Sequence, residues 1–412
     1  MIGDNNNWPL MHLSECCVSI ADGDHQPPPK ADSGVPFVTI SNIVSNKFDF
    51  SDTMFVPMAY YESLDSKRKA KAGDILYSVV GSFGIPVFID DNVPFVFQRH
   101  IAILRPSPDI ILPKFLYYSM LSHKFYQMAD AAAVGAAQRT VSLTALRNMK
   151  IGVPDLATQQ KIIDVLAPYD DLIATNQKQI SLLEEAAQRI YKEWFIDFHF
   201  PGYETANIEE GIPKGWSYQL LPDVFDFVRG KSYSSDELDN SHGTLMVNLK
   251  NIRAFGGYKR NEEKRFTGDY KPSQTLVPGD VIMGVTDMTQ ERRLVGHVAM
   301  VPDMKETMTF SMDLIKLIPK SVTRNFLYST FYYGGFSKQI SQLANGVNVL
   351  HLKPEAMMSL QMLVPSEDII YKYDTVFEPY RLRIETLQNQ CNMAEEARTR
   401  LLPQLMNGAF NE

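Results

Sequence analysis

Core-type side chains recur at alternating intervals of four and three residues in the middle of the chain, from Ile162 to Trp194. This heptad spacing predicts a helix with a coiled-coil seam. The spacing returns near the end of the chain, from Tyr373 to Leu405. Two seams of equal length in one chain predict that the helices pair with each other, antiparallel or side by side. The seam residues that we expect to be covered are Leu166, Tyr169, Ile173, Asn176, Ile180, Leu183 and Ile190 in the first helix, and Phe377, Tyr380, Ile384, Leu387 and Leu401 in the second.

Each predicted helix contains a proline, Pro168 or Pro379. Proline disrupts the interior of a helix but suits its first turn. We therefore expect a short helix before each proline and a long one after it.

Two seam positions differ in polarity between the helices. Asn176 stands where the second helix has Leu387, and a buried Asn is either a tolerated imperfection or a residue that fixes the register. Arg398 stands where the first helix has Ala187. We expect it to point to solvent or to meet one of the glutamates at 184–185.

The two helices are part of a long internal repeat. Residues 167–189 align without a gap with residues 378–400, at an offset of 211. Upstream, residues 135–154 align with residues 346–365 at the same offset. Further upstream the offset drifts, as loop insertions would cause. The chain is therefore an internal duplication.

Strand patterns dominate the segments between the helices. Apolar, β-branched runs predict strands at 35–43, 73–80, 86–90, 244–252, 279–285 and 295–301, and helical periodicity occurs at 114–129 and 324–341. Each repeat is expected to be a sheet-rich globule followed by a helical rod. The predicted domains are 1–154, the first globule; 155–200, the first helical spacer; 201–365, the second globule; and 366–412, the second helical spacer.

Composition narrows the class of protein. The 412 residues include three cysteines, too few for a disulfide framework, and no apolar run approaches the ~20 residues that a membrane helix needs. The first ten residues lack the features of a signal peptide. These features predict a protein of the reducing cytoplasm.

The acidic balance of the chain resides mainly in the helices. The net charge is −8, yet residues 1–154 hold 13 basic and 14 acidic groups, and residues 201–365 hold 18 of each. The helical segments account for −4 and −3. The globules therefore remain free to present local basic faces, despite the overall charge.

The sequence contains three segments that partly resemble catalytic motifs, but each lacks a required residue or spacing. The sequence at 229–232, "RGKS", lacks the first glycine of a phosphate loop, and "DNVPF" at 91–95 lacks the first proline of the motif that grips adenine in methyltransferases. "PDMKE" at 302–306 has the wrong spacing for a metal nuclease. The eight histidines show no paired spacing for a metal. We predict neither a catalytic residue nor a metal ligand.

The junction after the first helix carries a family resemblance. Trp194, Phe195, Asp197 and Phe198 end that helix, and the second globule opens on Gly215 and Trp216. Together with the duplication, these residues resemble the specificity subunits of type I restriction-modification systems. The likeness covers nearly the whole chain. The second copy departs from the pattern in two places: "SEDIIYK" replaces "ATQQK" at the start of the helix, and "GVNVLHLKP" replaces "GAAQRTVSL" in a loop.

The resemblance implies a fold and a function. The fold is α+β, with two repeated α/β-mixed target recognition domains joined by two long antiparallel coiled-coil helices in a pseudo-twofold arrangement. Each domain reads one half of a bipartite site in double-stranded DNA, and the helices set the gap and dock two modification subunits. Two restriction subunits are possible further partners. The chain itself is non-catalytic and carries no cofactor; S-adenosylmethionine and ATP with Mg²⁺ belong to the partner subunits.

Candidate DNA contacts are the clustered basic residues and the Gln and Arg residues of loops. Lys and Arg suit phosphate, whereas Gln and Arg read adenine and guanine edges. In the first domain the phosphate candidates are Lys67, Arg68, Lys69 and Lys71, and the base or loop candidates are Ser78, Ser82, Gln98, Arg99, Gln138 and Arg139. In the second they are Lys259, Arg260, Thr286, Gln290, Arg292, Arg293, Asn348 and His351.

An alternative interpretation belongs to another class. The helices could oligomerise a scaffold whose globules bind peptides, with no DNA partner. The duplicated globules and the aromatic junction favour DNA recognition over this alternative.

Overall fold

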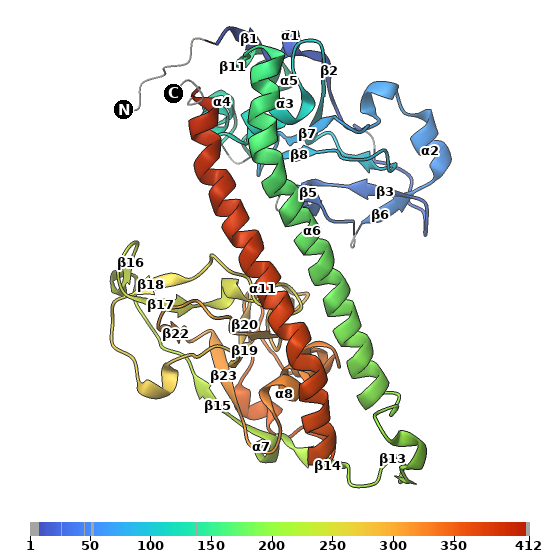
Figure 1. Ribbon diagram of the computed structural model, residues 1–412, viewed down its shortest axis with the longest axis vertical. Helices are drawn as coiled ribbons and strands as arrows, with labels where there is room; N and C mark the ends of the chain where they lie inside the picture. The colour runs from blue at the N-terminus through green and yellow to red at the C-terminus, as the bar shows by residue number, and fades with distance from the viewer. Residues whose placement is uncertain (1–7, 26, 45, 51–52, 137, 409–412) are drawn as a thin grey trace. The chain divides into compact units, whose positions relative to one another are not determined.

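The computed structural model describes residues 8–408 except 26, 45, 51–52 and 137 (Figure 1). The chain divides into two compact units, Met1–Ala174 with Cys391–Glu412, and Thr175–Gln390. Two helices of 40 residues, α6 (Leu156–Phe195) and α11 (Glu367–Met406), each contribute one part to each unit. The long helices and the mixed sheet-and-helix domains that they join confirm the predicted fold class. The four domain boundaries predicted from the sequence stay predictions.

The first unit is built on two small sheets. The larger is antiparallel, with the strand order β2 (Cys17–Asp22), β10 (Ile101–Pro106), β7 (Ile75–Ser78) and β8 (Pro86–Phe88). The smaller has the order β6 (Met54–Val56), β3 (Val35–Val38) and β9 (Val96–Phe97), and its β3–β9 pair is parallel. Two further pairs are β1 (Leu10–His12) with β11 (Lys150–Gly152), and β4 (Ile43–Val44) with β5 (Lys47–Phe48).

The second unit repeats this topology. Its larger sheet has the order β15 (Phe225–Arg229), β23 (Leu314–Pro319), β19 (Val281–Gly284) and β21 (Val298–Met300). The second sheet has the order β16 (Leu238–Asp239), β18 (Lys264–Phe266), β17 (Thr244–Val247) and β22 (Met308–Phe310), again with one parallel pair, β17–β22. The remaining pairs are β12 (Ile208–Glu209) with β13 (Ile212–Pro213), β14 (Ser217–Leu220) with β25 (Gln361–Val364), and β20 (Thr286–Asp287) with β24 (Leu350–His351).

Short helices accompany the strands in both units. In the first they are α1 (Leu13–Cys16), α2 (Met58–Ser63), α3 (Pro113–Leu121), α4 (His123–Ala132) and α5 (Leu143–Asn148). In the second they are α7 (Leu221–Val224), α8 (Arg324–Tyr332), α9 (Phe336–Ser341) and α10 (Pro354–Met357). None of the helices in the described part of the chain is long and apolar enough to cross a bilayer.

Several predicted elements are shorter than the sequence indicated. In the runs at 35–43 and 244–252 the first strand has only four residues, and a 3-10 turn follows each. In the first run a new strand, β4, begins at Ile43. The side chains of Asn42 and Asn251 accept hydrogen bonds from the backbone N–H of Thr39 and Asn248, at 2.8 and 2.9 Å. These local bonds compete with strand pairing and end the strands.

The two helical runs are each broken into two helices. Ser122 separates α3 from α4 in an extended conformation, and its hydroxyl accepts a hydrogen bond from Phe125 N. Gly335 separates α8 from α9 with φ of 73°, a left-handed conformation that favours glycine. The polar cap and the glycine therefore override the apolar periodicity.

The prediction of a helix break at each proline is wrong. Pro168 and Pro379 lie inside continuous helices. Both prolines are exposed, as are Asp164 and Thr375, the residues four positions earlier whose carbonyl groups lose their partner. Water can bond these carbonyls, so the cost of each proline is offset and the seam continues.

The two helices run antiparallel within each unit. In the first unit the buried side chains of Ile162 and Leu166, at the start of α6, share a core with Leu402 and Leu405, at the end of α11. In the second, residues 187–195 of α6 share a core with the start of α11. Every predicted seam residue lies in a buried or half-buried position: Leu166, Tyr169, Ile173, Asn176, Ile180, Leu183, Ile190, Phe377, Tyr380, Ile384, Leu387 and Leu401.

Polar contacts fix the two anomalous seam positions. Asn176, only 3% exposed, donates from Nδ2 to Gln390 Oε1 at 3.1 Å, within the second unit. Arg398 pairs with Asp170 within the first unit. The expectation that Arg398 meets solvent, Glu184 or Glu185 is wrong, because Asp170 on the antiparallel helix lies directly opposite it.

The aromatic junction is part of the core of the second unit. Phe195, Phe198 and Phe200 surround Trp216, with ring centroids 5.2–5.9 Å from that of the indole. Phe195 also meets Tyr373 of α11 edge-on at 4.9 Å. These residues therefore lock the end of α6 to the start of the second domain.

Candidate functional site

Two loops and a turn meet at the end of β7 in the first unit. Gly81 N donates to Arg139 O and Val141 N donates to Val79 O, both at 2.9 Å, which joins the loop after β7 to the segment before α5. Val79 N also donates to His100 O at 2.9 Å, which joins the turn between β9 and β10. The structure thus brings together three segments that carry sequence-predicted contacts.

The side chains at this meeting point are mostly exposed. Ser82, Gln138, Arg139 and Arg99 are exposed, and Gln98 is half-buried. The guanidinium of Arg139 pairs with Asp130 and lies 5.4 Å from the centroid of the Phe83 ring. Arg139 is therefore held in one orientation while part of it still faces solvent.

Ser78 does not fit the predicted role. It is fully buried, and its hydroxyl accepts a hydrogen bond from Ile85 N at 2.9 Å. The side chain shapes the turn after β7 from inside the domain, and DNA cannot reach it in this structure.

The basic cluster of the first unit lies on a 3-10 turn, Ser66–Arg68, and the residues after it. Lys67 and Lys71 are exposed. Arg68 lies 3.7 Å from Asp22, and Lys69 donates to Glu62 O at 2.8 Å. Lys67 and Lys71 thus keep their charges available for phosphate, whereas Arg68 and Lys69 are partly engaged.

The second unit has a corresponding meeting of loops. Strands β20 and β24 pair Thr286 with His351, and Leu352 N donates to Val285 O at 2.8 Å. The side chain of Gln290 crosses between the loops and donates from Nε2 to Val347 O at 2.7 Å. Gln290 therefore links the loops, which leaves less of its amide for a base edge.

The remaining candidates of the second unit differ in exposure. Arg293, Asn348 and His351 are exposed. Thr286 is half-buried, and its hydroxyl donates to Asp313 at 3.1 Å. Arg292 is half-buried with φ of 54°.

Lys259 and Arg260 contact residues outside these two loops. Lys259 pairs with Glu262 at 2.7 Å and is exposed. The side chain of Arg260 is only 10% exposed and lies 3.8 Å from Glu385 of α11. Burial lowers the pKa of Arg260, and Glu385 offsets part of that effect. Arg260 holds the second domain to α11 and is not a surface contact in this structure.

Sequence reasoning missed Asp287, which is fully buried beneath the loop that carries Gln290 and Arg293. Its carboxylate accepts hydrogen bonds from the backbone N–H and the hydroxyl of Thr289, each at 2.8 Å. An Asp followed two residues later by Thr is a turn signal that the sequence does contain.

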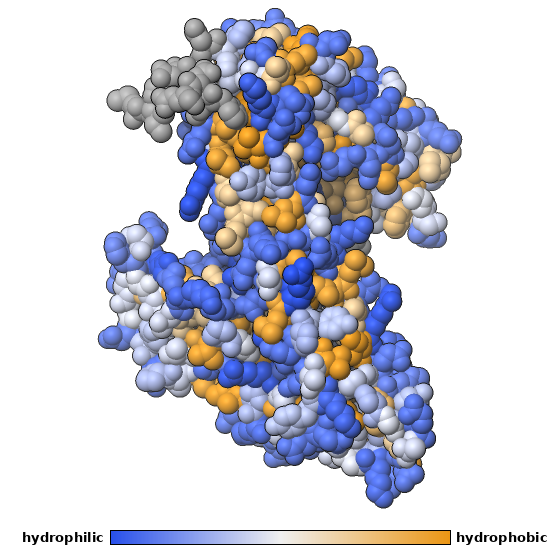
Figure 2. Space-filling view, in the orientation of Figure 1, coloured by the Kyte–Doolittle hydropathy of each residue, from blue (hydrophilic) through white to orange (hydrophobic). Residues whose placement is uncertain are grey.

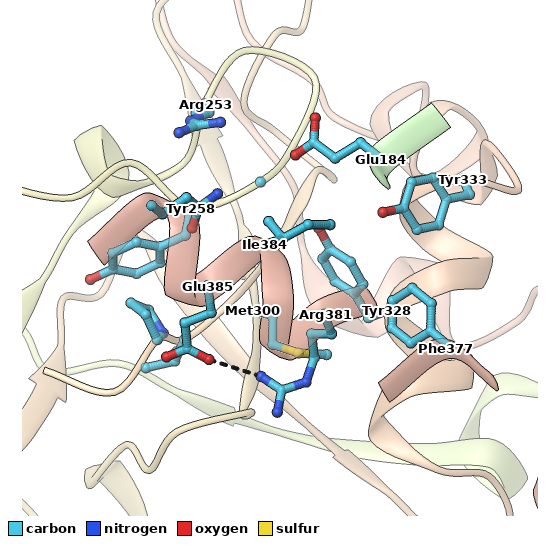
Figure 3. Close-up of a pocket in the computed structure, with 14 residues that line it drawn as sticks. Glu184, Arg253, Tyr258, Met300, Tyr328, Tyr333, Phe377, Arg381, Ile384 and Glu385 are labelled. Atoms are coloured by element: carbon cyan, nitrogen blue, oxygen red, sulfur yellow. Dashed lines mark hydrogen bonds and ion pairs between the residues drawn. The ribbon is translucent and has the colours of Figure 1, made fainter. Parts of the chain in front are cut away.

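A pocket of the second unit lies where its domain meets both long helices (Figure 3). Burial raises the pKa of Glu184 in this pocket, and Arg253 offsets part of the rise. The side chain of Arg381 pairs with Glu385 at 3.1 Å. Tyrosine rings and the ion pair line this space, between the domain and the helices. Over the described parts of the chain, no group of three or more His, Cys, Asp or Glu side chains could hold a metal ion.

Comparisons with known proteins agree with one another. Residues 15–185 match the type I restriction modification DNA specificity domain. The chain is 22% identical to the type I restriction enzyme HindI specificity subunit of Haemophilus influenzae, over 91% of this chain and 94% of that protein. It is 26% identical to the putative type I restriction enzyme MjaX specificity subunit of Methanocaldococcus jannaschii, over 87% and 83%.

A solved structure has the same fold. The S subunit of a type I restriction-modification system from M. genitalium aligns over 98% of this chain and 97% of its own, with a TM-score of 0.58 and 13% identity.

Proposed function

We propose that the chain is a specificity subunit like the type I restriction-modification proteins that it resembles, and that it reads a bipartite DNA site, one half with each of its two domains. The observation that carries this proposal is the duplication. The larger sheets of the two units have equivalent strand orders, and in each unit loops meet after the corresponding strand, β7 or β19. Two equivalent readers match a site with two separate halves.

Exposed loop residues supply the chemistry for reading bases. Arg139 in the first domain and Arg293 in the second carry guanidinium groups, which bond guanine O6 and N7 in the major groove. The exposed Lys67 and Lys71 suit phosphate contacts that add affinity without sequence preference. In this proposal the antiparallel helices set the gap between the half-sites.

The chain is proposed to catalyse nothing by itself. Methylation of adenine with S-adenosylmethionine is assigned to two modification subunits, and ATP- and Mg²⁺-dependent activity to two restriction subunits where these are present. In this proposal the chain recognises the DNA sequence, and its partner subunits carry out the reactions.

A repeated surface patch on the helices supports docking of two identical partners. Leu182 on α6 is 56% exposed, and its equivalent at the repeat offset of 211, Met393 on α11, is 71% exposed. Each is followed three residues later, on the same helix face, by an exposed glutamate, Glu185 or Glu396. Figure 2 shows apolar residues exposed among polar ones along α11. An exposed apolar side chain beside one glutamate, present twice, suits a partner with a small apolar socket.

The test is to assemble the chain with its modification subunit and S-adenosylmethionine and to sequence the methylated DNA. A split adenine motif with a fixed gap is the expected result. In a complex with Arg139→Ala, discrimination should fall at one position of one half-site, by about 10- to 100-fold. Methylation by the chain alone, an unsplit motif, or no methylation with any modification subunit would contradict the proposal.

A further inference from the structure

The loop after the central strand differs in length between the two units. In the first, the segment between β7 and β8 has seven residues, 79–85. In the second, the corresponding segment between β19 and β21 has thirteen, 285–297. The second domain therefore has six additional residues at the place where the loops meet.

A single buried carboxylate organises the longer loop. Asp287 Oδ1 accepts hydrogen bonds from the backbone N–H and the hydroxyl of Thr289, and Oδ2 accepts from the backbone N–H of Leu294 at 2.6 Å and of Val295 at 3.2 Å. The bonds come from both ends of the loop, so the carboxylate closes it. Burial by itself raises the pKa of Asp287, but these bonds outweigh burial and the net pKa lies below its usual value. The group therefore stays ionised at neutral pH.

Further contacts fix the far side of the same loop. Phe255 N donates to Arg293 O at 2.7 Å. The buried ring of His297 lies edge-on to the ring of Phe255, with centroids 5.6 Å apart. Gln290 bonds the neighbouring loop through Val347 O. Asp287, Phe255 and Gln290 thus hold the backbone from three directions, while the side chain of Arg293 stays exposed.

We infer that Asp287 is the positioning residue of the second recognition domain, and that the loop 287–295 presents Arg293 to a G·C pair of the second half-site. The inference rests on the proposed function and adds to it the residue that sets the geometry of the loop carrying Arg293. Arg293 is the base-contacting group because its guanidinium is exposed and its backbone is fixed. Asp287 acts only through the loop, since it has no exposed atoms.

The experiment compares two buried aspartates that flank the same strand. Asp280 precedes β19 and Asp287 follows it, and both are buried. Asp280 accepts from Val277 N and pairs with Arg324 at 3.0 Å, at the opposite end of the strand from the recognition loop. Asp280→Asn is therefore a matched control for the loss of a buried carboxylate from this domain.

Complexes with Asp287→Asn, Asp280→Asn and Arg293→Ala are assembled with the modification subunit, and the methylated motif is sequenced. Arg293→Ala should lower discrimination by about 10- to 100-fold at one G·C pair of one half-site. Asp287→Asn should relax or lose the same half-site and leave the other half and the gap unchanged. Asp280→Asn should keep both halves, even where its thermal stability falls.

The outcomes separate this inference from the proposed function. If the unmodified complex yields no split motif, the proposed function fails before any variant is considered. If that motif is found but Asp287→Asn keeps both halves intact, or Asp280→Asn relaxes the same half equally, the positioning role is refuted. Because Arg293 is exposed, its variant should fold normally, and unchanged specificity there would refute the base contact.

Discussion

The ion pair between Asp170 and Arg398 ties the two long helices together in the first unit, and Asp170→Asn tests its contribution. Asp170 Oδ2 also accepts a hydrogen bond from the hydroxyl of Tyr118 at 2.6 Å. Burial, and then the bond to Asp170, raises the pKa of Tyr118 well above its usual value, so this hydroxyl remains a donor. The substitution therefore removes one charge from a three-residue network and leaves Arg398 without its partner.

The magnitude follows from the burial of the pair. The side chains of Asp170 and Arg398 are 22% and 21% exposed. Breaking a fully buried pair costs about 3–5 kcal/mol, whereas exposed pairs contribute at most about 1 kcal/mol. Partial access of water places Asp170→Asn between these limits, at about 2 kcal/mol. The coupling energy between Asp170→Asn and Arg398→Gln is expected to be about 1–2 kcal/mol.

The assay is urea unfolding of the full chain, followed by circular dichroism, for the two single variants and the double variant. Asp171→Asn is the matched control, because Asp171 is the next residue and is 73% exposed, with Lys114 at 3.8 Å. Its effect should stay below about 0.5 kcal/mol. A coupling energy near zero, or a control as destabilising as Asp170→Asn, would refute the reasoning.

Two further predictions concern the helices. Asn176→Leu should raise the free energy of unfolding by about 1 kcal/mol in urea titrations. The apolar side chain would fill the seam, and the exposed Gln390 can bond water instead. A large loss of stability would show that the Asn176–Gln390 bond is required. Leu182→Glu or Met393→Glu alone should leave one modification subunit bound, and the double variant none, as measured by native mass spectrometry; two subunits retained by the double variant would exclude these patches as the docking sites.

The sequence predicted those features that depend on repetition and periodicity. The offset of 211 predicted two equivalent domains, and the heptads predicted two long helices, because both patterns extend over many residues and tolerate local exceptions. The proline breaks failed for a specific reason. Pro168 and Pro379 lie on the exposed side of their helices, and only the fold shows whether the freed carbonyls reach water.

The candidate site was predictable only at the level of segments. Residue type and repeat alignment selected the loops that carry Arg139 and Arg293, but the meeting of these loops with other candidate segments was not predicted. The roles of individual side chains were not visible, because they depend on burial. Ser78 and Arg260 turned inward, and Asp287 acts from beneath the surface. A one-dimensional pattern identifies polar residues but does not distinguish a buried anchor from an exposed contact.

The diverged charges on the two helices favour pairing between unlike halves of the chain. At equivalent positions the first helix has Asp170 and Ala187, and the second has Arg381 and Arg398. In the observed antiparallel register Asp170 pairs with Arg398 in the first unit. In the second unit Ala187 is fully buried, and Arg381 pairs with Glu378 and Glu385 of its own helix. If two copies of the first helix paired in this register, Asp170 would face Ala187 and lose its cation. Two copies of the second would place Arg381 against Arg398, which like-charge repulsion disfavours. The exchange of charge thus converts a duplicated, self-complementary rod into one that prefers its partner within the chain.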